Sequence, residues 1–212
     1  MGTTTPPWFA PVETVVATAR ADQLSRILPP PDGGRRAAVL MLFGDGPEGR
    51  DILLIQRAAT LSSHGGQVAF PGGVIDPGDV GPVDAALREA QEETGLDPSG
   101  VHIVGNLPDL YVPPSNFVVT PVVGWWAHSS PVDVVDAGEV HRVERVPISE
   151  LLDPGHRFTV RHPSGFTGPG FEVRDLFVWG FTAGLLSRVM ALAGWEEPWD
   201  ESYVRPVREV TE

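Results

Sequence analysis

The sequence contains no cysteine among its 212 residues. Disulfide bonds, thiolate metal ligands and a cysteine nucleophile are therefore excluded. It also has no apolar run near the roughly 18–20 residues that a helix needs to cross a bilayer. The N-terminal stretch has no basic segment followed by an apolar one, as a signal peptide would have. We therefore expect no signal peptide, no membrane partner and a cytoplasmic location.

Basic residues are scarce, with 15 Lys and Arg against 28 Asp and Glu and a net charge of -13. Such a surface repels nucleic-acid phosphates and anionic lipid, so nucleic acid is not an expected partner. A small anionic substrate would need a metal ion or a local basic spot. The sequence also lacks a P-loop, a GxSxG elbow and an HExxH pair, so kinase, esterase and zinc-protease functions have no support.

Length and composition fit one folded domain, because 42% of the residues are hydrophobic. We expect three segments: an N-terminal helix and linker over 1–34, a central domain over 35–194 and a C-terminal tail over 195–212. The pattern predicts a helix over 12–28 after a frayed start, with Ile27 and Leu28 on its apolar side. The tail is expected to be loosely held.

Apolar runs in the central domain alternate between strand and helix patterns. Strands are predicted over 37–43, 51–57, 67–70, 101–111, 117–127 and 140–146, with two more strand-like pieces between 156 and 175. Helices are predicted over 82–94, 148–152 and 176–193. This alternation predicts a single α/β or α+β domain.

The helix predicted over 82–94 carries an unusual acidic face. Glu89, Glu92 and Glu93 stand at i, i+3 and i+4, and each like-charge pair at this spacing costs about 0.2–0.5 kcal/mol on an isolated helix. Arg88 lies one turn from Glu92 and could neutralise part of the cluster. A solvated acidic face is one explanation. A bound divalent cation is the other, because Mg²⁺ and Mn²⁺ prefer carboxylate oxygens.

The segment before this helix favours the second explanation. Phe70-Pro71-Gly72-Gly73 is a tight turn whose backbone N–H groups could meet an anion, and Asp76 and Asp79 follow in a loop. The ordered run from Gly73 through Asp79 to Arg88-Glu89-Ala90-Gln91-Glu92-Glu93-Thr94-Gly95-Leu96 resembles the box of the Nudix hydrolases. Two features depart from that box: Asp79 replaces a glutamate, and its spacer to Arg88 is one residue longer.

This resemblance implies an α/β/α sandwich with a mixed β-sheet and cleavage of nucleoside diphosphates linked to another group. It implies Mg²⁺ or Mn²⁺ held by Glu89, Glu92 and Glu93, with the Gly73 carbonyl as a helper. Glu92 and Glu93 become candidates for the catalytic base, and Arg88 belongs to the same catalytic group. Glu139 lies where some members place an extra ligand or base, although it could be an ordinary loop acid.

A second resemblance concerns the residues before the box. Residues 53–58, LLIQRA, and 64–73, HGGQVAFPGG, are similar to the signature of coenzyme A (CoA) pyrophosphatases, as is the late run VWGFTA at 178–183. Ile55 and Ser62 depart from that signature, where threonine and arginine are usual. The resemblance implies hydrolysis of CoA or acyl-CoA to 3′,5′-ADP and (acyl-)4′-phosphopantetheine.

Substrate contacts are expected from Arg57, His64, Gly72 and Gly73. Arg57 is a candidate phosphate clamp or a surface arginine, and His64 fits packing or a substrate hydrogen bond better than a metal ligand. Trp125 and Trp126 should point to opposite faces of a strand, either as core residues or with one stacked on adenine.

Two further readings stay open. Pro113-Pro114 occupies a loop where relatives that cleave ADP-ribose often carry a proline, so ADP-ribose or another nucleoside-diphosphate derivative is an alternative substrate. A nucleotide sensor without turnover is another alternative, although sensors often lose the acids that REAQEETG retains. The expected partner is a small CoA-like dinucleotide derivative, and a homodimer is possible.

Overall fold

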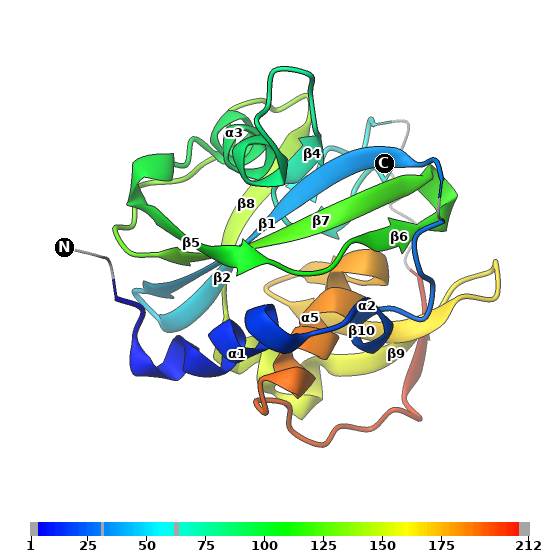
Figure 1. The fold of residues 1–212 in the computed structure, drawn as a ribbon. Helices are drawn as coiled ribbons and strands as arrows, with labels where there is room; N and C mark the ends of the chain where they lie inside the picture. The colour runs from blue at the N-terminus through cyan, green and yellow to red at the C-terminus, as the bar shows by residue number, and fades with distance from the viewer. Residues whose placement is uncertain (1–3, 31, 62–63, 208–212) are drawn as a thin grey trace.

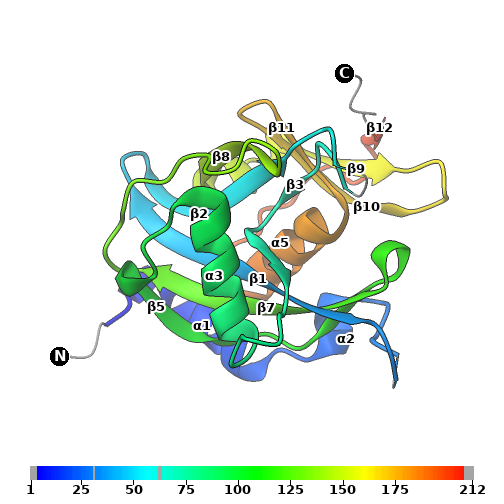
Figure 2. The same ribbon diagram turned by 90° about the horizontal axis from the view of Figure 1, so that it is seen from above.

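The structure is a computed structural model that describes residues 4–30, 32–61 and 64–207. Its main sheet has eight strands, with β3-β2-β1-β7-β5 as the central path and β4, β6 and β8 paired to β1, β7 and β2 (Figures 1 and 2). The strands are β1 (Arg35–Gly46), β2 (Gly49–Arg57), β3 (Val68–Ala69), β4 (Gly72–Val74), β5 (Val101–Asn106), β6 (Leu110–Val112), β7 (Phe117–Trp126) and β8 (Val140–Pro147).

The main sheet is mixed, because β1 and β7 run parallel while the other pairs are antiparallel. The predicted α/β class with a mixed sheet is confirmed. A second sheet of four strands has the order β11-β10-β9-β12. Its strands are β9 (Arg157–Arg161), β10 (Thr167–Val173), β11 (Leu176–Val178) and β12 (Val204–Pro206).

Helices cover both faces of the main sheet. Helix α3 (Pro82–Thr94) lies on one face, and α1 (Ala10–Thr18) and α5 (Gly180–Leu192) lie on the other (Figure 1). Side chains of neighbouring strand residues alternate between these faces, so Trp125 packs with α1 and α5 and Trp126 packs with α3. Within the described part of the chain, every helix is too short or too polar to cross a membrane.

The N-terminal segment differs from the sequence prediction. The helix predicted over 12–28 is wrong, because α1 ends at Thr18 and a separate short turn, α2 (Ala21–Leu24), follows. Residues 7–11 are helical rather than frayed, and Phe9 among them is 0% exposed and lies 5.4 Å from Phe43 between ring centroids. Ile27 and Leu28 are exposed and belong to no buried stripe.

Two predicted elements in the central domain are also divided. The strand predicted over 101–111 is split into β5 and β6. The helix predicted over 176–193 is wrong in its first turn, because Leu176–Val178 forms β11 and pairs with β10. Gly180, with φ of 67°, takes the chain from this strand into α5. The helices predicted over 82–94 and 148–152 are confirmed as α3 and α4 (Ile148–Leu152).

Residues 195–207 of the C-terminal tail are held against the body of the protein, so the expectation of a loose tail is wrong for this part. Arg157 on β9 is buried, and its guanidinium donates to Glu196 at 2.7 Å and lies 4.5 Å from the centre of the Trp199 ring. Further along, β12 adds a parallel strand beside β9. The division of the chain into three segments stays a prediction.

The glycine turn is part of the main sheet. Strands β1 and β2 pair only from Phe43 to Gly46 and then diverge. The segment from β3 to β4 fills the opening: Ala69 pairs with β2, Gly73 pairs with β1, and Pro71 accepts a 2.8 Å hydrogen bond from the Leu40 N–H. The sheet therefore holds this turn in place.

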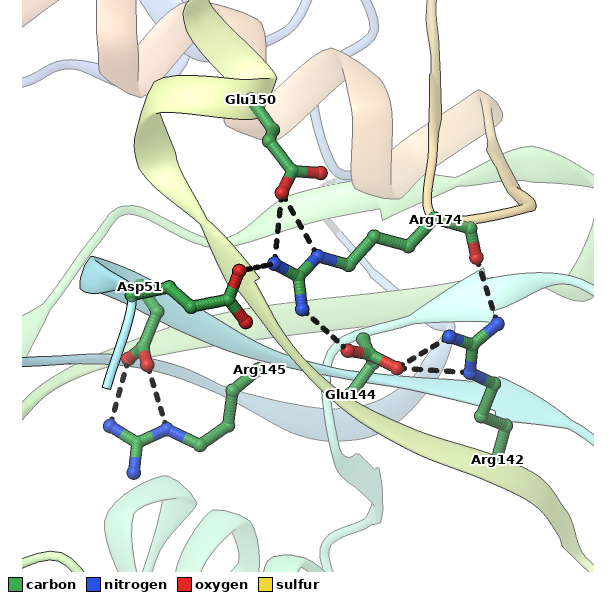
Figure 3. Close-up of polar contacts among 7 residues, drawn as sticks. Asp51, Arg142, Glu144, Arg145, Glu150 and Arg174 are labelled. Atoms are coloured by element: carbon green, nitrogen blue, oxygen red, sulfur yellow. Dashed lines mark hydrogen bonds and ion pairs between the residues drawn. The ribbon is translucent and has the colours of Figure 1, made fainter. Parts of the chain in front are cut away.

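An ion-pair network joins the two sheets (Figure 3). Arg174, in the turn between β10 and β11, donates to Glu144 of β8 at 3.2 Å, to Glu150 of α4 at 2.9 Å and to Glu48 at 2.6 Å. Arg142 of β8 donates to the Arg174 carbonyl at 2.8 Å. Arg174 has φ of 51°, so this network surrounds a residue in the left-handed region.

Candidate functional site

Helix α3 forms where the sequence predicts it, for local reasons. Pro82 occupies the first turn, Asp84 accepts from the Val80 N–H at 3.1 Å, and Gly95 ends the helix with φ of 70°. Ala86 and Ala90 are fully buried against the sheet. This packing fixes the rotation of the helix and thereby the direction of its acidic face.

Glu93 is the most deeply placed carboxylate of this face. Its side chain is 3% exposed, Oε2 accepts from the Gly72 N–H at 2.8 Å, and Oε1 lies 3.7 Å from the Arg57 guanidinium. Burial raises the pKa of Glu93 to about 8, although the Gly72 hydrogen bond and the Arg57 charge act in the opposite direction. Glu93 is therefore a carboxyl group that can hold or release a proton near neutral pH.

Glu89 is packed against the glycine turn. A Cβ atom on Gly73 would lie 2.5 Å from the Glu89 carboxyl carbon, so only glycine leaves room for this carboxylate. Burial raises the pKa of Glu89, Arg88 lowers it, and the charges of Glu92 and Glu139 raise it further. A cation beside Glu89 would relieve both the burial and the repulsion.

Arg88 connects the helix to the loop before it. Its Nε and Nη2 atoms donate to the two oxygens of Asp79 at 2.9 and 3.0 Å, and Nη2 also donates to the Val74 carbonyl. Its Nη1 donates to Glu89 at 3.0 Å and to Glu92 at 3.1 Å. The bidentate contact lowers the pKa of Asp79. In this arrangement the guanidinium orders the acidic face.

Glu92 and Glu139 lie at the solvent side of the site. The Glu92 side chain is 60% exposed and contacts Arg88. Glu139 ends the turn that begins at Asp136, and its carbonyl accepts from the Ala58 N–H at 2.8 Å. Because the Glu139 charge raises the pKa of both Glu89 and Glu93, it stands close enough to act on the same centre.

The carboxylates are not gathered as metal ligands in this arrangement. Among residues 4–30, 32–61 and 64–207, no three His, Asp or Glu side chains are grouped so that they could hold a metal ion. Glu89 and Glu92 turn to Arg88, and Glu93 turns to the Gly72 N–H. The donor chemistry still suits a hard cation, because Glu89, Glu92 and Glu93 offer carboxylate oxygens from one helix face.

The remaining predicted residues are spread around this centre. His64 has φ of 58°, and its Nδ1 lies 3.1 Å from Gln67 Oε1, so its ring packs within its own loop. Trp125 and Trp126 are both buried, the first against Trp8 and the second under Arg145, so neither offers a free face to adenine. Ser62 lies outside the described residues.

The sequence reasoning named the run VWGFTA at 178–183 but missed that α5 begins within it, at Gly180. Thr182 stands there as a buried polar residue, and Trp179 precedes it with its ring against His162. The glycine after Trp179 was a usable signal, because an isolated glycine between apolar runs often marks a change of element. Because 176–193 was predicted as one helix, the start of α5 at Gly180 was not recognised.

Fold and site together define a hydrolase of the pyrophosphohydrolase class. The NUDIX domain family model matches residues 34–163. The Nudix hydrolase NudL of Cronobacter sakazakii, described as uncharacterized, is 41% identical over 171 residues, covering 77% of this chain and 85% of that protein. NudL of Escherichia coli K12 is 38% identical and covers 74% and 82%. The chain belongs to the Nudix family.

A solved structure shows the same fold. A Nudix hydrolase from M. smegmatis, RenU, aligns with a TM-score of 0.50 and 22% identity, covering 77% of this chain and 88% of that one. The NUDIX domain of Shewanella oneidensis NrtR, solved with ADP ribose, aligns with a TM-score of 0.46 and 20% identity over 64% and 87%. Members of this family generally require divalent metal ions.

Proposed function

We propose that the protein hydrolyses the pyrophosphate bond of CoA or acyl-CoA to 3′,5′-ADP and (acyl-)4′-phosphopantetheine. One observation carries this proposal: both halves of the CoA-like signature meet at one carboxylate. Arg57, from LLIQRA, and Gly72, from FPGG, both contact Glu93. The signature is thus compatible with a single substrate site built around the Nudix helix.

In this proposal Glu89, Glu92 and Glu93, with the Gly73 carbonyl, would hold Mg²⁺ or Mn²⁺. The bound ion would neutralise pyrophosphate charge and lower the pKa of water. Arg57 would bind a phosphate oxygen, because its guanidinium is the basic group beside Glu93. His64 and the Gly72–Gly73 backbone would border the substrate, and Arg88 would keep the carboxylates oriented.

The attacking water must lose a proton. Glu93 is one candidate acceptor, because its carboxylate lies buried at the centre of the site. Glu92 and Glu139 are the alternative acceptors, since both face solvent at the same centre. Water adds to one phosphorus, the P–O–P bridge breaks, and each product leaves with a terminal phosphate.

ADP-ribose is the second candidate substrate. Pro113 and Pro114 form a short turn between β6 and β7, at the loop where ADP-ribose-cleaving relatives often carry proline. The departure at Ser62 also bears on substrate choice rather than on hydrolysis. A nucleotide sensor without turnover is less favoured, because all three acids of the Nudix helix are present.

The test is hydrolysis by the purified chain with Mg²⁺ or Mn²⁺, using CoA, ADP-ribose, NADH and dATP in parallel. Chromatography should resolve 3′,5′-ADP and phosphopantetheine, with the highest kcat/KM for CoA. Glu93→Gln should abolish turnover, and Glu201→Gln, at an exposed acid of the tail, should keep it. A higher kcat/KM for ADP-ribose would reject the CoA assignment. Nucleotide binding without any turnover would favour the sensor.

A further inference from the structure

The segment between β7 and β8, residues 127–139, is tied to the last turn of α3. The Asp133 N–H donates to the Thr94 carbonyl at 3.0 Å, and the Val135 N–H donates to the Glu93 carbonyl at 3.4 Å. Carbonyl groups in the last turn of a helix have no partner within the helix, so this segment supplies one. It therefore lies against the helix end that carries Glu93.

Asp136 closes the turn that follows. Its Oδ1 accepts a hydrogen bond from the Gly138 N–H at 2.7 Å. Its carbonyl accepts from the Glu139 N–H at 3.1 Å and from the Val140 N–H at 2.9 Å. An aspartate side chain that binds a backbone N–H two residues further on forms an Asx turn, which fixes the path of the chain. One residue thus determines how the chain enters Glu139.

The backbone of Glu139 is also held on its other side. Its carbonyl accepts from the Ala58 N–H at 2.8 Å. Val140, the next residue, is 0% exposed and pairs with Arg57 across β8 and β2. The Arg57 guanidinium lies 3.7 Å from the Glu93 carboxylate. The turn therefore brings Glu139 to the strand end that reaches the buried carboxylate of the site.

The side chain of Glu139 is exposed and unengaged. Within the part of the chain that the structure describes, its carboxylate has no hydrogen bond and no ion pair, whereas Glu89 and Glu92 contact Arg88. The Glu139 charge nevertheless raises the pKa of Glu89 and Glu93, so it lies close enough to act on their centre. The backbone of Glu139 is fixed while its carboxylate remains available to a water, a cation or a substrate.

We propose that Asp136 is a positioning residue for the reaction, because its turn sets where the Glu139 carboxylate lies relative to Glu93 and Arg57. Asp136 acts through the backbone and not through contact with the substrate. Without its side chain the turn loses the hydrogen bond that closes it, and the Glu139 carboxylate spreads over more positions. The role of Glu139, as proton acceptor or as cation ligand, rests on the proposed function.

Steady-state kinetics on the full chain test this proposal, with Mg²⁺ and the best-cleaved of CoA, ADP-ribose, NADH and dATP. Asp136→Ala should lower kcat about tenfold and change KM little, because a displaced group costs transition-state stabilisation rather than binding. Asp136→Asn removes the charge but keeps the Oδ1 acceptor, so it should retain the native kcat. Equal loss in both variants would overturn the proposal, since the charge rather than the turn would then matter.

A second aspartate offers a matched control between α4 and β9. Asp153 Oδ1 accepts from the Gly155 N–H at 2.8 Å, and its carbonyl accepts from the His156 N–H at 3.1 Å, so this turn has the same pair of hydrogen bonds. Asp153→Ala should leave kcat unchanged. An equal loss of kcat in Asp153→Ala would mean that such turns act only through the stability of the fold, which the melting temperatures of both variants check.

A double variant tests whether Asp136 acts through Glu139. Glu139→Gln should lower kcat at least as much as Asp136→Ala does. Adding Asp136→Ala to Glu139→Gln should cost no further rate, because residues that act as one unit are not additive. A further loss of about tenfold in the double variant would reject the proposal. An unchanged kcat in Glu139→Gln would also reject it, because Glu139 would then have no role for Asp136 to support.

Hydrogen exchange tests the positioning without turnover. The Ala58 N–H is bonded to the Glu139 carbonyl, so in Asp136→Ala it should exchange about tenfold faster than in the native chain. Asp136→Asn and Asp153→Ala should keep the native rate. If the chain cleaves none of the four substrates, the proposed function fails, and this exchange rate still decides the positioning. A native rate in Asp136→Ala would overturn it.

Discussion

Gly73 and Glu89 share a space that has no room for one more carbon atom. A Cβ atom on Gly73 would lie 2.5 Å from both the carboxyl carbon and one oxygen of Glu89. The clash involves the mobile end of a side chain, so the fold can accommodate it by moving the carboxylate. We expect Gly73→Ala to lower kcat at least tenfold with little change in melting temperature, because misplaced catalytic groups lose rate steeply.

At Gly72, the neighbouring glycine, an added Cβ atom would meet backbone rather than a side chain. Gly72 has φ of 153°, and a Cβ there would lie 2.6 Å from the backbone Cα of Val39. We expect Gly72→Ala to destabilise the protein by about 2 kcal/mol or more, since the strand backbone cannot move aside. Gly78→Ala, in open space, is the control and should change neither property. Equal loss of stability at Gly72 and Gly73 would contradict this distinction.

The raised pKa of Glu93 predicts that the stability of the metal-free protein depends on pH. Its pKa rises from 4.5 in its ordinary state to about 8 in the folded protein. The folded chain therefore retains a proton that the unfolded chain releases, and this contribution is complete below about pH 4.5 and is lost as pH rises through 8. Stability should fall by up to about 1.4 kcal/mol per pH unit across this window.

Urea unfolding with EDTA between pH 5 and about pH 9 measures this slope. Glu93→Gln should flatten it and should be more stable than the native chain at the alkaline end, whereas Glu201→Gln should reproduce the native slope. Glu89, whose pKa is also raised, leaves a smaller residual slope in Glu93→Gln. A native slope that survives Glu93→Gln intact would show that other groups carry the dependence.

Phe9 ties the N-terminal segment to the core. Its ring lies 5.4 Å from Phe43 and 5.9 Å from Trp125 between centroids, and it is 0% exposed. Phe9→Ala should reduce the free energy of unfolding by about 3–5 kcal/mol. Ile27→Ala, at a residue 51% exposed, should stay within about 0.5 kcal/mol. Chemical denaturation compares them, and a small effect at Phe9 would mean that this segment is not part of the core.

Substitutions in the turn between β10 and β11 can distinguish the effect of backbone strain on stability from that of ion pairing. Arg174 and Asp175 have φ of 51° and 64°, so glycine at either position relieves the backbone. Asp175→Gly should be neutral or stabilising by up to about 1 kcal/mol. Arg174→Gly gains the same relief but removes the donor to Glu144 and Glu150, so it should be destabilising by about 1–2 kcal/mol.

The measurement is the melting temperature of the two variants at low and high salt. The difference between Arg174→Gly and Asp175→Gly should shrink as salt rises, because screening weakens partly exposed charge pairs. If the two variants melt together at low salt, the network contributes no net stability.

The elements predicted well are those whose signals are local. Helix α3 was bounded correctly because Pro82 and Gly95 mark its ends and its apolar residues recur at helical spacing. The glutamate face followed from the same periodicity. The start of helix α5 was predicted wrongly because the apolar pattern of Leu176 and Val178 fits a strand and a helix equally well. Their pairing with β10 makes this segment a strand.

The contacts that could not be predicted join residues far apart in sequence. Nothing near Phe9 signals burial under β1 and β7, and nothing near Glu196 signals a buried arginine at position 157. The hydrogen bond from Gly72 to Glu93 depends on how β1 and β2 diverge. The carboxylate face could therefore be foreseen, whereas its partners required the fold.

The insertion of the glycine turn between β1 and β2 affects how the site can move. Leu40 and Ile55 take backbone partners from this turn, through Pro71 and Ala69. Opening the turn would leave hydrogen-bonding groups of two central strands unpaired in the interior. The amide hydrogen of Leu40 should consequently exchange with solvent only when the whole domain unfolds. Substrate entry is then left to the outer loops, and the turn that faces Glu93 is as rigid as the sheet itself.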